Sequence, residues 1–141
     1  MNLSDAELEA LLSEPESDRV ERKESFRGDV PEKARQAICA FANDLPSYRK
    51  PGVVFIGAKD DGSPSGLAVT DELLLQLANI RTDGNILPLP SMTVENRILK
   101  GASMAVITVM PADAPRCVTK VGPGYAPDHG GELQALKTNG S

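Results

Sequence analysis

Apolar residues recur at helical spacing in three segments of the chain. The clearest is residues 31–43, where Ala, Ile and Phe side chains stand at positions i, i+3, i+4, i+7 and i+8. Residues 4–15 begin with the Ser-x-x-Glu pattern of a capping box and continue with leucines on one face. A leucine-rich run over residues 70–82 follows a threonine suited to capping a helix. The pattern therefore predicts three helices.

Shorter apolar runs predict strands. Residues 52–57 and 104–110 are nearly unbroken apolar runs rich in β-branched side chains, which is typical of core strands. The Asp-Gly pair at 61–62 predicts a hairpin turn after the first of these runs. The other candidate strands are residues 20–26, 66–69, 92–98 and 116–121.

These elements predict an α+β domain, in which a small mixed β-sheet of about five to six strands packs with two to three helices. The order of the elements, helices interspersed among strands of mixed direction, supports this class. We expect one domain over residues 1–121. Residues 122–141 contain five Gly and two Pro without periodicity, so we interpret them as a flexible tail.

The charge of the chain is acidic overall but unevenly distributed. The net charge is −5, which excludes a strongly basic nucleic-acid coating protein. Residues 1–18 hold six acids and no bases, whereas residues 19–50 hold eight bases against five acids. The basic segment fits either a phosphate-contacting surface or an ordinary solvated mixed-charge face, and the sequence leaves both open. With neither a signal peptide nor a long apolar run, we expect a cytoplasmic protein with no membrane partner.

Several common catalytic motifs are missing. The segment 57–63 lacks the Lys-Ser/Thr end of a P-loop, so we do not expect ATP as a cofactor. The one histidine, His129, lies in the tail, where no third group can orient it. Cys39 lies inside the clearest helix and is expected to be a small buried apolar residue, not a nucleophile.

Three acids are candidate metal ligands: Glu16, Glu21 and Asp60. Hard divalent cations such as Mg²⁺ or Mn²⁺ prefer carboxylate oxygens. Five residues apart on a straight strand, Glu16 and Glu21 would point to opposite faces, so convergence requires Glu16 to lie in the preceding loop. The residues alone favour ordinary solvated acids over a metal site.

Three segments resemble the Schlafen-type AlbA-like domain. Residues 16–25 (ESDRVERKES) are similar to its E-S-x-x-[LV]-E-[FY]-K-x-S opening, and residues 37–43 to its helix end. Residues 52–62, followed by Gly66-Leu67, are similar to its G-x-[IL]-[ILVF]-I-G-V-x-D-D-G hairpin. The resemblance covers roughly residues 14–121 and implies an AlbA-like Schlafen core. Arg22 departs from the family pattern, which has an aromatic residue there.

The resemblance implies a link to nucleic acid. Bacterial members are commonly regarded as transcription regulators, and some animal members are metal-dependent endoribonucleases that act on structured RNA. The three carboxylates of that metal site correspond here to Glu16, Glu21 and Asp60. Lys23 would stabilise the negative charge that develops during cleavage.

We therefore expect a regulatory module that binds DNA or RNA through basic side chains at Arg22, Lys23, Arg27, Arg49, Lys50 and Lys59. An alternative is an Mg²⁺- or Mn²⁺-dependent endoribonuclease whose catalytic residues are Glu16, Glu21, Asp60 and Lys23. A third reading, the nucleotide-binding part of a larger transcriptional regulator, is weakened by the missing P-loop. The sequence leaves open whether the chain cleaves or only binds, and whether it forms a homodimer.

Overall fold

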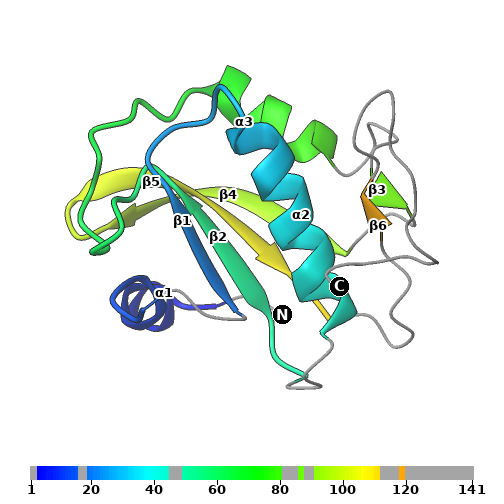
Figure 1. Cartoon of the computed structure of the whole chain (residues 1–141). Coiled ribbons are helices and arrows are strands. Elements are labelled where there is room, and N and C mark those ends of the chain that lie inside the picture. Colours follow the sequence, from blue (N-terminus) through cyan, green and yellow to red (C-terminus); the bar gives the residue numbers. More distant parts are fainter. Residues whose placement is uncertain are drawn as a thin grey trace.

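A four-stranded mixed sheet lies at the centre of the computed structural model (Figure 1). Its strands run in the order β1 (Val20–Lys23), β2 (Gly52–Ile56), β5 (Ala102–Val109) and β4 (Met92–Leu99). The helices are α1 (Asp5–Leu12), α2 (Val30–Asn43) and α3 (Asp71–Asn79). The short strands β3 (Ile86–Leu87) and β6 (Val118–Thr119) pair with each other. The structure describes residues 3–15, 19–44, 49–80, 86–87, 91–111 and 118–119.

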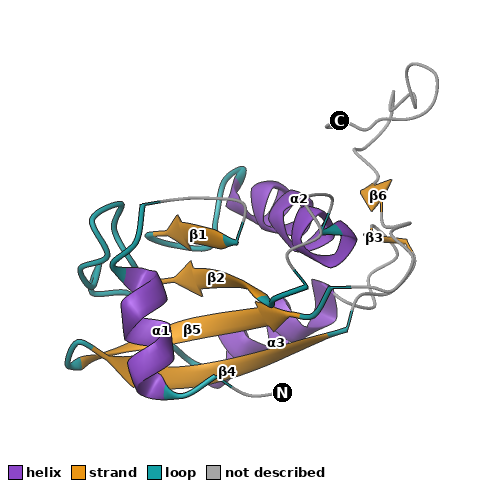
Figure 2. Ribbon diagram, turned by 90° about the horizontal axis from the view of Figure 1, so that it is seen from below, coloured by secondary structure: helices purple, strands orange, loops and turns teal. Residues whose placement is uncertain are grey.

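The sheet is covered on both faces, which is why its central strands are almost wholly apolar (Figure 2). α2 and α3 pack on one face, against residues such as Val54 and Ile107, and α1 packs on the other, against Phe55 and Val106. All five residues of β2 are buried, as expected for a strand between two layers. The first position of this strand requires glycine, since a Cβ at Gly52 would enter the ring of Phe41.

The helices begin where the sequence predicts. Ser4 and Glu7 form the capping box of α1, with the Glu7 N–H donating to Ser4 Oγ at 3.1 Å. Thr70 Oγ1 accepts from the Leu73 N–H at 3.0 Å at the start of α3. In the part of the chain that the structure describes, no helix combines the length and apolar character needed to cross a bilayer.

The α+β class is confirmed, but the predicted strand count of the sheet is wrong. β1 ends at Lys23, not at residue 26, and residues 66–69 do not form a return strand. Just before this segment the chain makes an isolated bridge between Ala58 and Pro64, and the ladder does not continue because proline has no N–H to donate. The predicted edge strand in residues 116–121 is β6, which pairs with β3 and not with the main sheet. Residues 122–141 lie outside the described residues, so the tail stays a prediction.

Arg22 is a buried structural residue, which contradicts its predicted role as an exposed phosphate contact. Its side chain is on the α1 face of β1, and the residue is only 4% exposed. One guanidinium nitrogen, Nη1, donates to the carbonyls of Leu12 at 3.1 Å and Glu14 at 2.5 Å. The last carbonyls of a helix have no partner within it, so Arg22 supplies one at the end of α1.

We predict that Arg22→Ala lowers the free energy of unfolding by about 2–4 kcal/mol, since it removes a charged donor from buried carbonyls. The matched control is Arg27→Ala, at an exposed loop position, which should change stability by less than about 0.5 kcal/mol. Urea denaturation followed by circular dichroism measures both. Equal small effects of the two substitutions would show that Arg22 does not stabilise the fold.

Candidate nucleic-acid and metal site

Glu21 and Lys23 lie together on the face of the sheet that α2 covers. The parallel register places Glu21 beside Val54 and Lys23 beside Ile56, both of which belong to the core under α2. Lys23 Nζ is 2.9 Å from Glu21 Oε2, and both side chains are about a quarter exposed or less. Part of the positive charge of Lys23 is therefore compensated within β1 itself.

The loop of residues 57–65 is attached to the end of β1. The N–H groups of Gly57 and Ala58 both donate to the carbonyl of Lys23, at 2.7 and 3.1 Å. Ser65 Oγ donates to the carbonyl of Glu24 at 2.8 Å. Gly62, at φ +88°, packs closely on the Leu12 carbonyl at the end of α1. The loop thus has a fixed base, and its tip, residues 59–61, is exposed.

The two neighbouring aspartates of this tip have different environments. Asp61 Oδ1 accepts from the Ser63 N–H at 2.9 Å and from Ser63 Oγ at 2.6 Å. These hydrogen bonds from Ser63 lower the pKa of Asp61. Asp60 is exposed, and no hydrogen bond or ion pair of its carboxylate is found within the described ranges. Asp61 therefore stabilises the turn, whereas Asp60 can meet a ligand.

The three predicted carboxylates are only partly placed. Glu21 is on β1, Asp60 is four residues beyond the end of β2, and Glu16 lies outside the described residues. Among the residues that the structure describes, no group of three or more His, Cys, Asp or Glu side chains is arranged to hold a metal ion. The oxygen donors suit Mg²⁺ or Mn²⁺, and the three-carboxylate site itself stays a prediction.

The predicted basic residues divide between the two ends of β2. Lys23, Arg27 and Lys59 lie at the carboxyl ends of β1 and β2 or in the loops that follow them. Arg49 and Lys50 are exposed just before β2 begins, and the Arg49 N–H donates to Asp44 Oδ2 at 2.7 Å. A strand of five residues separates the two groups by about 17 Å. They do not form a single compact patch.

The amino end of α2 lies at the same end of the sheet as Lys23 and Lys59, since α2 connects the parallel strands β1 and β2 (Figure 1). The Asp29 side chain does not cap this helix, and its carboxylate lies 3.5 Å from Lys33 Nζ instead. The positive end of the helix dipole therefore adds to the basic side chains nearby. Pro31 signals the start of this helix in the sequence, but only the crossover between parallel strands shows which end of the sheet it faces.

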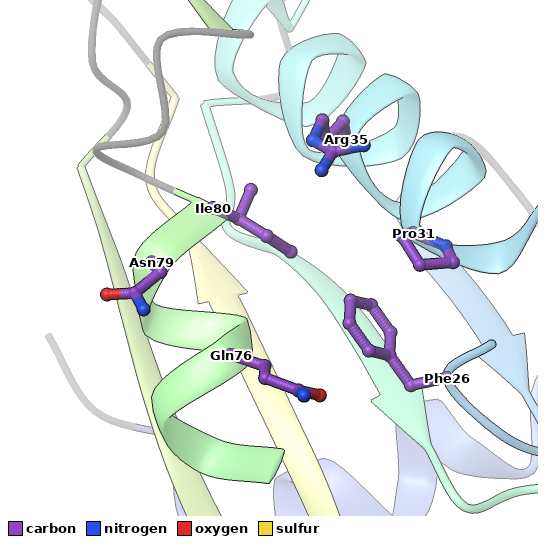
Figure 3. Close-up of a pocket in the computed structure, with 6 residues that line it drawn as sticks. All are labelled: Phe26, Pro31, Arg35, Gln76, Asn79 and Ile80. Atoms are coloured by element: carbon purple, nitrogen blue, oxygen red, sulfur yellow. The ribbon is translucent and has the colours of Figure 1, made fainter. Parts of the chain in front are cut away.

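A hollow of about 420 Å³ lies between the first half of α2 and the end of α3. In Figure 3, Phe26, Gln76 and Ile80 point into this space, and Arg35 lies beside it on α2. The lining side chains come from separate elements, so no local sequence pattern indicates the hollow. Phe26, which lines the hollow, directly precedes Arg27, so the hollow lies near the loop that follows β1.

Cys39, which the sequence places inside a helix as an apolar residue, is 6% exposed on α2. It takes part in a disulfide and so is not a free thiol. His129 lies outside the described residues.

Comparisons with known proteins agree with this fold. No curated protein sequence matches the chain. One similar solved structure is the solution NMR structure of the N-terminal domain of a protein from Nitrosomonas europaea, named as ATP-dependent DNA helicase RecG-related. The TM-score is 0.55 at 23% identity, over 96% of this chain and 94% of that one, which shows a shared fold. The family model described as Schlafen, AlbA_2 matches residues 16–130, so the chain belongs to the Schlafen AlbA_2 family.

Proposed function

We propose that this chain is a cytoplasmic regulatory module that binds nucleic acid at the carboxyl ends of β1 and β2. The observation behind the proposal is that Lys23, Arg27 and Lys59 lie at or just after the ends of β1 and β2, at the same end of the sheet as the amino end of α2. Basic side chains and helix amino ends are the groups that hold phosphate in proteins. Membership in the Schlafen AlbA_2 family supports a nucleic-acid ligand.

Acidic groups at the same end determine how phosphate would be bound. Glu21 compensates Lys23, and Asp60 and Asp61 stand directly beside Lys59 in the chain. These carboxylates repel phosphate unless a cation offsets them. We therefore expect Mg²⁺ or Mn²⁺ to strengthen binding, with the exposed Asp60 as a ligand.

Metal-dependent cleavage of structured RNA is the second candidate function. The observation that favours it is the attachment of the Asp60 loop to β1, through the Lys23 carbonyl, on the strand that also carries Glu21. A bound Mg²⁺ or Mn²⁺ would supply Lewis-acid chemistry at the phosphate. Glu21, Asp60 and Glu16 would hold it, while Lys23 would stabilise developing negative charge. A protein that binds without cleaving would use the same residues for affinity alone.

Substitution of the basic residues tests the proposed binding surface. Lys59→Ala and Arg27→Ala should each weaken binding and reduce the slope of log K against log salt by about one, because each removes a phosphate contact. Lys50→Ala is the matched control, since Lys50 is exposed at the opposite end of β2, and it should leave affinity and slope unchanged. Fluorescence anisotropy with labelled structured RNA and duplex DNA measures both quantities. A larger effect of Lys50→Ala than of the other two substitutions would show that nucleic acid binds at the opposite end of β2, and would contradict the proposal.

Substitution of the two adjacent aspartates tests the role of the metal ion. Asp60→Asn should abolish the gain in affinity from Mg²⁺ or Mn²⁺, because it removes a ligand charge, and should slow any RNA cleavage at least about tenfold. Asp61→Asn should retain both activities, since the Asp61 carboxylate serves the turn.

Cleavage of a structured RNA by the parent chain, lost in Asp60→Asn, would establish the nuclease function. A metal-dependent gain in affinity without cleavage would leave the binding function alone. Binding that is indifferent to both metals would contradict the role given to Asp60.

A further inference from the structure

β4 is the outer strand of the sheet on the side away from β1 (Figure 2). It has eight residues, and among the strands that the structure describes it pairs only with β5. The outward N–H and C=O groups of such an edge can pair with a strand of another chain. This edge lies far from the candidate nucleic-acid site, because β1 and β4 are at opposite sides of the sheet.

The register shows which backbone groups of β4 face outward. The Met110 N–H donates to the Ser91 carbonyl at 2.9 Å, which makes Ser91 and Met110 a directly hydrogen-bonded pair. Such pairs alternate along an antiparallel ladder. The even-numbered residues Val94, Asn96 and Ile98 therefore point their N–H and C=O groups away from β5.

We propose that β4 pairs antiparallel with β4 of a second copy of this chain, about a two-fold axis at Asn96. In this register Asn96 faces Asn96 of the second copy, and Val94 faces its Ile98. All three residues have outward backbone groups, so each can exchange hydrogen bonds across the axis. The product is a homodimer with one continuous sheet of twice the strand number.

Charge selects this register over its neighbours. With the axis at Asn96, Glu95 faces Arg97 of the second copy twice, in the closer, non-hydrogen-bonded positions of the ladder. An axis at Glu95 or Arg97 would place like charges opposite each other, and an axis at Val94 or Ile98 would give neither residue an opposite charge on the second copy. Only one symmetric pairing centred within residues 94–98 is therefore complementary.

The Arg97 side chain is already held in place for this contact. Its Nε donates to Glu95 Oε1 at 3.1 Å, its Nη2 donates to the Leu3 carbonyl at 2.5 Å, and Nη1 pairs with Asp5 on α1. The side chain keeps 21% of its surface exposed, and that of Glu95 keeps 39%. An Arg fixed by intramolecular bonds loses little entropy when a second carboxylate approaches.

An exposed apolar side chain supports the same pairing. Ile98 is 59% exposed, one of two large apolar side chains so exposed among the described residues. It lies on the α3 face of β4 together with Val94, which packs against the core on that face. The proposed axis brings Ile98 against Val94 of the second copy and removes both from water.

Two cysteine variants of the full chain test the register. Asn96→Cys should form a covalent dimer under mild oxidation, because directly opposed residues lie within disulfide reach. Thr93→Cys is the matched control: it is equally exposed on β4, but it faces Leu99 of the second copy. Both variants also contain Cys39 and Cys117, so any difference between them comes from the introduced cysteine.

A charge exchange tests the contact itself. Glu95→Arg should weaken the dimer at least about tenfold, and adding Arg97→Glu should restore it, because opposite charges face each other again. Analytical ultracentrifugation measures the dissociation constant, and circular dichroism confirms that each variant is folded. A parent chain that stays monomeric at about 100 µM would overturn the proposal, since the dissociation constant would then exceed any useful range. Equal cross-linking of the two cysteine variants, or no effect of Glu95→Arg, would also overturn it.

Discussion

The parallel pairing of β1 with β2 determines which face of the sheet each candidate residue of β1 occupies. The register Val20–Val53 to Lys23–Ile56 turns Val20 and Arg22 toward α1 and leaves Glu21 and Lys23 on the α2 face. A slip of one residue would exchange these two sets and bury the Glu21–Lys23 pair under α1. The pairing continues past the strands, since the Lys23 carbonyl accepts from Gly57 and Ala58 at the base of the loop that carries Asp60.

Leu12 connects this arrangement to the amino-terminal helix. Its carbonyl accepts from Arg22, and the same carbonyl lies against Gly62 of the Asp60 loop. Helix α1, strand β1 and the candidate loop therefore meet at one backbone group. Arg22 is buried and holds the end of α1, whereas Arg27 and Lys59 are exposed.

Local signals in the sequence predicted the helices, because caps such as Ser4 and Thr70 act within one turn of their own position. Long-range contacts decided what the sequence did not predict. Arg22 is buried because α1 ends beside it. Residues 66–69 do not join the sheet because Pro64 interrupts the ladder. The division of basic residues between the two ends of β2 likewise follows from the crossover through α2. Of the three predicted carboxylates, the described residues place Glu21 and Asp60.

The net charge of −5 does not describe the whole surface, because several of the acids make contacts within the fold. Acids of the amino-terminal segment serve the fold: Asp5 pairs with Arg97, and Glu9 Oε2 accepts from the Lys100 N–H at 2.9 Å. These contacts lie on the α1 face and the β4–β5 turn, away from the edge strand β1. An acidic chain can thus keep a local surface for phosphate, since charge interactions are screened over about 10 Å at ordinary salt.

If nucleic acid binds at the carboxyl ends of β1 and β2, it should perturb the backbone there. Backbone amide chemical-shift mapping by NMR, with a short structured RNA added in Mg²⁺, measures this residue by residue. The largest shifts should fall in residues 24–30 and 57–62. Shifts concentrated in residues 49–52, or along β4, would contradict it.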